Sequence, residues 1–238
     1  MKKIAVFSDI HANLQALQSI LEDIDKDSFD EVIYLGDIIG NGPNPKECID
    51  MFMDSKIKVV KGNHEIYLTV PDQTFNKLTH EEINHRDWIG SQLNENELNY
   101  LEKLPMSIDL LIDGKLFTFS HFFLNEKKCY FESLDILGTN KEYEVINKQE
   151  TDYLFIGHSH DDFQISNGYL YTCVGSSGCR KNNTTFYTVI EVCDGIVKIY
   201  KNELSYDRKT FEKEINKKNY PNRDKTAEIF FGVKINKE

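Results

Sequence analysis

The chain has 238 residues, a length that one large two-sheet domain commonly fills, and no linker-like stretch or internal repeat divides it. Its 39 acidic and 28 basic residues give a formal charge of −11, which argues against a nucleic-acid partner because the protein would repel phosphates at a distance. Five irregularly spaced cysteines form no CxxC pair, and no stretch approaches the ~20 apolar residues of a membrane helix. We therefore expect one domain over residues 1–238, a cytoplasmic location and no membrane partner.

Five short apolar runs along the chain each end in a polar motif. They are predicted strands, because they are β-branched or aromatic and are bounded by loop residues. Ligands of open α/β sheets collect beyond the carboxyl ends of strands, so the motif side chains should converge on one site. In chain order, the runs cover residues 4–7, 32–35, 58–60, 116–119 and 153–156. The side chains that follow them are, in the same order, Asp9 and His11, Asp37, Asn63 and His64, His121, and His158 and His160.

Helical patterns lie between these strands. Asn13 stands directly before apolar residues at helical spacing over 14–24, which favours an N-cap role over a contact with phosphate. A later polar helical stretch contains His80 and His85. No motif includes these two histidines, and we predict surface positions for both.

The second half of the chain is richer in strand patterns. Residues 201–225 mix basic with acidic side chains, which predicts a solvated helical face. The pattern alone indicates an α/β or α+β fold, in which two sheets packed face to face with helices outside would bury all the apolar faces. The further strands are expected over residues 170–173, 185–192 and 196–200.

The polar residues at the strand ends supply seven oxygen or nitrogen donors and no thiolate. Such a mixture of imidazole, carboxylate and amide suits Mn, Fe, Zn, Co or Ni. Because one ion would not use seven donors, we expect two divalent transition-metal ions. Paired ions of this kind catalyse in-line displacement at phosphorus, which predicts a small-molecule phosphate ester as substrate.

The motif set resembles the calcineurin-like metallophosphoesterase superfamily, and five blocks of that family's signature occur here in order. Residues 36–45 with Cys48, and 174–178 with Arg180, are similar to its small prokaryotic phosphodiesterase branch. The resemblance implies a four-layer α/β/β/α sandwich of two mixed β-sheets flanked by helices. The blocks are Asp9-Ile10-His11, Gly36-Asp37, Gly62-Asn63-His64, His121 and Gly157-His158-Ser159-His160.

The resemblance also implies roles for individual residues. His64 would contact the phosphate together with Asn63 and would protonate the leaving alkoxide, while Glu65 would orient a ligand histidine. Manganese is the first metal to expect. The implied ligands are Asp9, His11, Asp37 and His160 for the first ion, and Asp37, Asn63, His121 and His158 for the second.

Several positions depart from the usual pattern of the branch or allow two readings. Ala12 replaces a common glycine, and Cys173-Val174 replaces an Asn-Pro pair, so the following loop should differ in shape. Phe122-Phe123 replaces a small polar loop and could reshape the wall beside the second ion. Arg180 could bind substrate phosphate through its planar guanidinium, or it could be an ordinary solvated loop residue.

Three functions then remain to be weighed. The leading interpretation is a dinuclear-metal-dependent phosphoesterase that hydrolyses a phosphodiester or a small phosphorylated metabolite. A protein Ser/Thr or dinucleoside polyphosphate phosphatase is less favoured, because the Asp-Arg-Gly of those relatives is absent after Gly36-Asp37. A non-catalytic scaffold with the same fold is the third alternative, and the intact ligand set argues against it. The sequence leaves the oligomeric state open.

Overall fold

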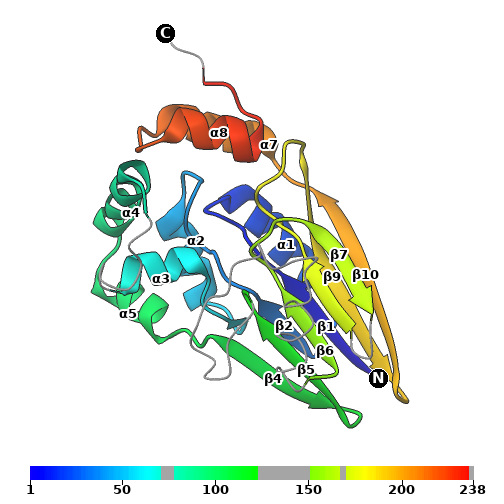
Figure 1. Cartoon of the computed structure of the whole chain (residues 1–238). Helices are drawn as coiled ribbons and strands as arrows, with labels where there is room; N and C mark the ends of the chain where they lie inside the picture. Colours follow the sequence, from blue (N-terminus) through cyan, green and yellow to red (C-terminus); the bar gives the residue numbers. More distant parts are fainter. Residues whose placement is uncertain (71–77, 123–150, 167–169, 236–238) are drawn as a thin grey trace.

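The computed structural model describes residues 1–70, 78–122, 151–166 and 170–235. Within these ranges, two five-stranded β-sheets pack against each other and seven helices flank them (Figure 1). Each sheet contains both parallel and antiparallel pairs. The fold is therefore an α/β sandwich of two mixed sheets flanked by helices, as predicted.

The first sheet is built around the amino-terminal strand. Its strands are, in spatial order, β10 (Ile196–Ser205), β9 (Thr184–Cys193), β1 (Lys2–Phe7), β2 (Glu31–Tyr34) and β3 (Lys58–Val59). β1, β2 and β3 are parallel, so their carboxyl ends share one edge. β9 runs antiparallel to β1, and β10 runs antiparallel to β9.

The second sheet has a similar parallel centre. Its strands are, in spatial order, β4 (Ser107–Ile112), β5 (Lys115–Ser120), β6 (Tyr153–Ile156), β8 (Leu170–Val174) and β7 (Asp162–Ser166). β5, β6 and β8 are parallel, and the two edge strands are antiparallel to their neighbours. β4 and β7 were not among the predicted strands, and their side chains alternate between half-buried and exposed along much of their length.

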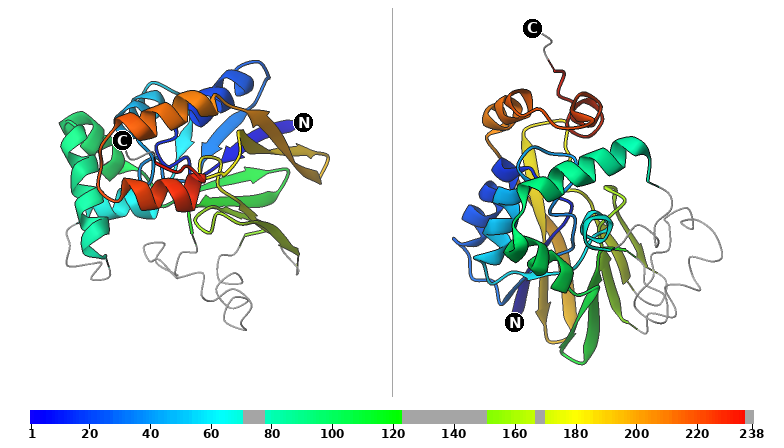
Figure 2. Two further views of the ribbon diagram at one scale, coloured as in Figure 1. Left: turned by 90° about the horizontal axis from the view of Figure 1, so that it is seen from above. Right: turned by 90° about the vertical axis from the view of Figure 1, so that its left-hand side faces the viewer.

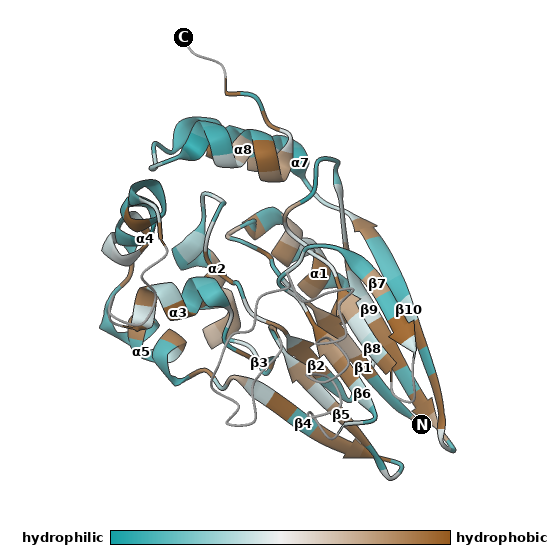
Figure 3. Cartoon of the chain, in the orientation of Figure 1, coloured by the Kyte–Doolittle hydropathy of each residue, from teal (hydrophilic) through white to brown (hydrophobic). Residues whose placement is uncertain are grey.

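The core between the sheets follows from the alternation of side chains along the strands. In β1, Ile4 and Val6 belong to the cluster between the sheets, whereas Ala5 and Phe7 belong to the cluster under the helices. From the second sheet, Phe119 and Phe155 stack with their ring centroids 5.2 Å apart in the same inter-sheet cluster. Figure 3 shows the hydrophobic colouring that runs along these strands.

Six of the helices contribute to the core cluster that also includes Ala5 and Phe7. These are α1 (Leu14–Ile24), α2 (Pro45–Met53), α4 (His80–Gln92), α5 (Glu95–Lys103), α7 (Arg208–Lys217) and α8 (Arg223–Phe231). The short α3 (Asn63–Thr69) instead buries Ile66 against Phe122. In the described ranges, no helix is long and apolar enough to cross a membrane.

Two predictions about local structure have different outcomes. Asn13 is the N-cap of α1, as predicted, because its Oδ1 accepts a hydrogen bond from the Ala16 N–H at 3.1 Å. The prediction of a helical face over 201–225 is wrong for its first residues. β10 continues to Ser205, because it pairs with β9 along its whole length. The two closing helices then lie near each other above the strand ends (Figure 2).

Candidate metal centre

The five polar motifs follow five of the six parallel strands, namely β1, β2, β3, β5 and β6, and they meet at one end of the sandwich. The loops after β1 and β2 are joined by backbone hydrogen bonds, of 3.1 Å from Asp9 N to Gly36 O and 3.0 Å from His11 N to Asp37 O. The second sheet adds His121 and His158, and the His158 N–H donates to Asp9 Oδ2 at 3.1 Å. Side chains from both sheets therefore surround one space.

The backbone turns sharply where these motifs begin. Five of the predicted ligands have positive φ in the left-handed region, namely Asp9 (54°), His11 (46°), Asp37 (60°), His158 (67°) and His160 (62°). Residues other than glycine adopt this conformation at a cost of about 1–2 kcal/mol each, although Asp and His are enriched among those that do. These turns point the side chains back over the ends of the strands that carry them.

The first group of donor atoms contains the residues predicted for the first ion. His11 Nε2 lies 2.9 Å from His160 Nε2, 3.6 Å from Asp37 Oδ2 and 3.7 Å from Asp9 Oδ1. His160 Nε2 lies 3.5 Å from Asp9 Oδ1. Asp9 and His11 share the loop after β1, whereas Asp37 and His160 come from the loops after β2 and β6.

The second group contains the residues predicted for the second ion. His121 Nε2 lies 3.0 Å from Asn63 Oδ1 and 3.4 Å from Asp37 Oδ2. His158 Nδ1 lies 2.8 Å from Asn63 Oδ1. Asp37 Oδ2 belongs to both groups, which is the arrangement expected of a bridging ligand.

The histidine tautomers show that lone pairs converge in these groups. His121 Nδ1 lies 2.6 Å from the Leu35 carbonyl, and His11 Nδ1 lies 3.2 Å from the Ile39 carbonyl. Because a carbonyl only accepts, Nδ1 carries the proton in both rings and Nε2 is left as a lone pair in the neutral form. Those lone pairs face carboxylate oxygens, which are also acceptors, so a cation is the natural partner for the group.

The spacing of the donors fits metal ions as well. Ligands bound about 2.1 Å from an ion lie roughly 3.0–3.4 Å from one another in octahedral or tetrahedral geometry. The donor separations of 2.8–3.7 Å within the two groups are close to that spacing. In addition, Asp9 Oδ1 is fully buried and accepts no hydrogen bond from the residues that the structure describes. Buried carboxylate oxygens are rarely left unpaired, so this one fits a metal ligand.

The charges of the buried side chains also favour a cation in the site. Burial lowers the pKa of His121, but the carboxylates of Asp37 and Asp9 outweigh burial and raise that pKa to about 9. Burial raises the pKa of Asp37, and the surrounding histidines overcome it, so the net shift is well below the ordinary value. The buried carboxylates thus hold their negative charge and favour positive charge beside them.

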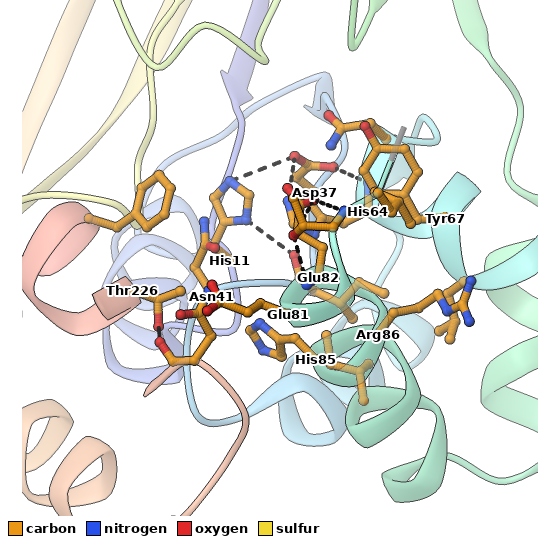
Figure 4. Close-up of a pocket in the computed structure, with 18 of the residues that line it drawn as sticks. His11, Asp37, Asn41, His64, Tyr67, Glu81, Glu82, His85, Arg86 and Thr226 are labelled. Atoms are coloured by element: carbon orange, nitrogen blue, oxygen red, sulfur yellow. Dashed lines mark hydrogen bonds and ion pairs between the residues drawn. The ribbon is translucent and has the colours of Figure 1, made fainter. Parts of the chain in front are cut away.

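His64 lies beside this centre. Its Nε2 is 4.0 Å from Asp37 Oδ2, and its backbone N–H donates to Asp37 Oδ1 at 2.9 Å. Gly40 leaves room for the ring, since a Cβ there would lie 2.7 Å from His64 Nδ1 and 2.9 Å from His11 Nδ1. The ring is partly exposed, so His64 is accessible from the cavity that covers the site (Figure 4).

Glu65 does not have the contacts expected of it. The sequence predicted that it orients a ligand histidine. Instead, its carboxylate accepts backbone N–H groups from Asp37 at 2.9 Å, Gly62 at 2.9 Å and Ile39 at 3.2 Å. Glu65 therefore positions the two loops that carry Asp37 and Asn63, because the backbone of these loops offers three free donors to a buried side chain.

Arg180 does not line the cavity. Its guanidinium pairs with Glu203 at 3.4 Å and lies over the Phe186 ring, 4.8 Å from the centroid. This arrangement gives no support to Arg180 as a phosphate-binding residue, and that role stays a prediction. The nearby acidic and aromatic partners, which lie on β9 and β10, account for the position of Arg180.

One aromatic side chain packs against the second donor group. Phe122 is buried and lies edge-on to His121 and His158, with centroids 5.3 and 6.0 Å apart, so it does form a wall beside the second group. The remainder of the predicted wall, from Phe123 on, lies outside the described residues.

The prediction of a donor set without sulfur missed Cys179. Its Sγ lies within 4.8 Å of donor atoms of His11 and His160.

A cavity of about 530 Å³ opens from the donor groups toward α3, α4 and α8. His11, Asp37, Asn63, His64 and His160 lie in its wall nearest the strands, and residues of α4 and α8 complete it. The ion pair between Lys225 and Glu81, 3.3 Å apart, joins the two helices. Figure 4 shows His64 and Tyr67 on one side of this space and Thr226 on the other.

His85 also lines this cavity, contrary to the predicted surface position. Only 7% of its area is exposed, because it packs against Trp88 and Tyr220. His80 is exposed, as predicted. Tyr220 follows α7 in the chain, so the sequence of α4 alone carried no signal for the burial of His85.

Fold and site together define a class of protein, in which two mixed sheets bring paired oxygen and nitrogen donors to their strand ends. The chain belongs to the calcineurin-like phosphoesterase superfamily, since the model of that domain matches residues 1–195.

Similar proteins come from archaea and bacteria. A hypothetical protein from Pyrococcus horikoshii superposes with a TM-score of 0.78 at 19% identity, covering 98% of this chain and all of that one. A metallophosphoesterase from Sphaerobacter thermophilus gives a TM-score of 0.65 at 23% identity, covering 90% and 92% of the two chains. Both are similar in fold. An uncharacterised protein of Methanocaldococcus jannaschii is 36% identical over 162 residues, which are 67% of this chain and 63% of that protein.

Proposed function

We propose that the protein is a dinuclear-metal-dependent phosphoesterase that hydrolyses a phosphodiester or a small phosphorylated metabolite. The observation that carries this proposal is the pair of donor groups that meet at Asp37 Oδ2. Membership of the phosphoesterase superfamily supports it. The cavity that opens from these groups has a volume typical of small-ligand sites.

The proposed ligands follow the two donor groups. Manganese is the first ion to test, because oxygen and imidazole donors suit it, although the same donors suit Fe, Zn, Ni or Co. When bound, two such ions would polarise the phosphoryl oxygens and supply a hydroxide nucleophile near neutral pH. Asp9, His11, Asp37 and His160 would hold the first ion, and Asp37, Asn63, His121 and His158 the second.

His64 has the proposed role of a general acid. Its ring stands at the edge of the donor groups and in the wall of the cavity, where it can donate a proton to the departing alkoxide. The hydrogen bond from its backbone N–H to Asp37 Oδ1 fixes the residue against the bridging carboxylate. His64 and the Asn63 side chain would both touch the phosphate, so a small-molecule ester must place its phosphorus between them and Asp37.

The alternatives have less support. A protein or dinucleoside polyphosphate phosphatase would need an arginine that binds the phosphate. Arg180 pairs with Glu203 outside the cavity, and the cations that line the cavity, Arg86 and Lys225, pair with Asp87 and Glu81. A non-catalytic scaffold would not need His64 beside a complete set of donors. The formal charge of −11 gives no support to a nucleic-acid substrate.

The test compares bis(4-nitrophenyl) phosphate with 4-nitrophenyl phosphate, using protein stripped of metal and then supplied with Mn²⁺. Turnover that depends on metal and favours the diester supports a phosphodiesterase. Preference for the monoester would direct the search to phosphorylated metabolites. His121→Ala should abolish metal-dependent turnover, and full activity of that variant would contradict the proposal.

A further inference from the structure

His85 is a buried polar residue in the wall of the cavity that the proposed chemistry does not use. It lies in the middle of α4 and lines the same cavity as His64 and Asp37. In Figure 4 its ring lies between the α4 residues and the side chains of Asn41 and Thr226. The residue is more than nine-tenths buried, yet it borders the place where a substrate would enter.

Aromatic packing holds the ring in a defined plane. The His85 ring stacks on Tyr220, with centroids 5.6 Å apart and planes 29° apart, and it contacts Trp88 at 5.8 Å. Trp88 and Tyr220 also stack on each other at 5.1 Å. The Tyr220 hydroxyl donates to the Asn41 carbonyl at 3.3 Å, which ties this aromatic group to the loop after β2.

The ring lacks hydrogen-bond partners among the residues that the structure describes. Nε2 is buried without a partner, and no described residue bonds to Nδ1. A half-turn of the ring keeps the stacking and exchanges its nitrogen and carbon positions, so either nitrogen can face the cavity. Burial, with a smaller effect from His64, lowers the pKa of His85 to about 4. The ring is therefore neutral at pH 7, with one donor and one acceptor.

We propose that His85 hydrogen-bonds the organic part of the substrate, and that this part carries uncharged hydroxyl groups, as a sugar or glycerol unit does. This inference rests on the proposed function, because the phosphate must occupy the donor groups for the organic part to reach α4. Buried polar groups are rarely left unpaired, and a substrate hydroxyl can both donate to and accept from a neutral imidazole.

The neighbouring side chains favour an uncharged organic part. Glu81 and Glu82 line the same wall and would repel an anionic group, while the two lining cations, Lys225 and Arg86, are paired with Glu81 and Asp87. Asn41 and Thr226 add neutral polar groups to the lining. The cavity of about 530 Å³ is large enough for a phosphate with a sugar-sized substituent.

The experiment uses two diesters that release the same 4-nitrophenolate. One is bis(4-nitrophenyl) phosphate, and the other is thymidine 5′-(4-nitrophenyl phosphate), whose second substituent carries a sugar hydroxyl. The readout is the ratio of kcat/KM for the thymidine ester to kcat/KM for the bis-ester. His85→Phe keeps an aromatic ring but no hydrogen-bonding atom, so the ratio should fall about tenfold, the value of one hydrogen bond.

Two further variants separate this role from a structural one. His85→Gln retains a hydrogen-bonding amide and should restore most of the ratio. His80→Phe changes an exposed histidine of the same helix and should leave the ratio at the wild-type value. An unchanged ratio in His85→Phe, or equal losses in His85→Phe and His85→Gln, would overturn the inference.

Binding gives a readout that does not require turnover. Trp88 is the chain's single tryptophan and touches His85, so its fluorescence reports on a ligand at this position. Ribose 5-phosphate, added with Mn²⁺, should change the Trp88 emission of the wild type, and it should bind at least about fivefold more weakly to His85→Phe than to the control variant His80→Phe. If the wild type hydrolyses neither diester, the proposed function fails, and an unaltered Trp88 emission would then also reject the His85 contact.

Discussion

The strand ends and the helical wall border the same cavity, but different interactions hold them in place. At the strand ends, backbone hydrogen bonds join the loops, and Glu65 binds three backbone N–H groups between them. Across the cavity, α4 and α8 are connected by the exposed pair of Lys225 and Glu81. One side of the cavity is therefore stabilised by buried polar bonds, and the other largely by side-chain packing and surface charge.

This difference suggests a division of roles. The proposed chemistry needs the donor atoms to lie within tenths of an ångström of the positions of metal ligands. Buried networks of backbone hydrogen bonds provide that precision. Recognition of the organic part of a substrate tolerates adjustment, so helices can supply it. Substitutions at the strand ends should consequently have larger effects than substitutions on α4 or α8.

The largest effect is expected for Asp37→Ala, which removes the atom shared by both donor groups. Bound metal should fall below two ions per chain, and turnover should decrease more than about 100-fold, since even indirect disruption of metal ligands costs 10–100-fold. Metal analysis by mass spectrometry after gel filtration measures this. Asp50→Ala, on the exposed side of α2, is the matched control. Two tightly bound ions in Asp37→Ala would exclude a bridging role.

His64→Ala should come next. It should retain both ions and lose about 10²–10⁴-fold in kcat on alkyl phosphodiesters, the usual contribution of a general acid. The loss on 4-nitrophenyl esters should be smaller, because nitrophenolate leaves without a proton. Equal losses on both kinds of ester, or loss of metal, would argue against an acid at this position.

Glu65→Gln tests the positioning of the loops. A glutamine has one carbonyl oxygen for three backbone N–H groups, and its amide would face a donor. The free energy of unfolding should fall by about 3 kcal/mol, as expected when buried donors lose a charged partner. Urea denaturation measures the change. Glu82→Gln is the control, because Glu82 makes the corresponding bonds at the exposed start of α4 and should cost less than about 1 kcal/mol. Similar changes in the free energy of unfolding for Glu65→Gln and Glu82→Gln would show that the burial of Glu65 does not add to its stabilising effect.

The smallest effect is expected for Lys225→Ala. Its side chain and that of Glu81 are 62% and 61% exposed, so breaking this pair should change the free energy of unfolding by less than about 1 kcal/mol. Thermal unfolding of Lys225→Ala and of the double variant with Glu81→Ala measures the coupling. A coupling energy above 2 kcal/mol would mean that the helical wall is held as firmly as the strand ends.

The part of the fold predicted best was the part with local signals. The five strands that precede the motifs were predicted to within two residues, because apolar runs and following loop residues mark them directly. The motifs at their ends then predicted which side chains converge. β10 was predicted to end at Tyr200, whereas its charged and alternating residues continue as a strand to Ser205 through pairing with β9.

The contacts missed by the sequence come from segments far apart in the chain. His85 is buried by Tyr220, which lies more than a hundred residues later. Cys179 approaches His11 through the loop after β8, and Arg180 is drawn to Glu203 by strand pairing. The local sequence pattern of a helix or loop does not predict such partners. A pattern can predict which residues supply donor atoms, but not which wall faces them.

The left-handed backbone at Asp9, His11, Asp37, His158 and His160 has a consequence for the uptake of metal. Hydrogen bonds between these loops and to neighbouring side chains support these strained conformations. Little of the entropy of the loops then remains to be lost on binding. We therefore expect association to be limited by the exchange of water on the aqueous ion, and chelators to remove the ions without unfolding the sandwich. Far-ultraviolet circular dichroism before and after chelation would show whether the empty scaffold keeps its shape.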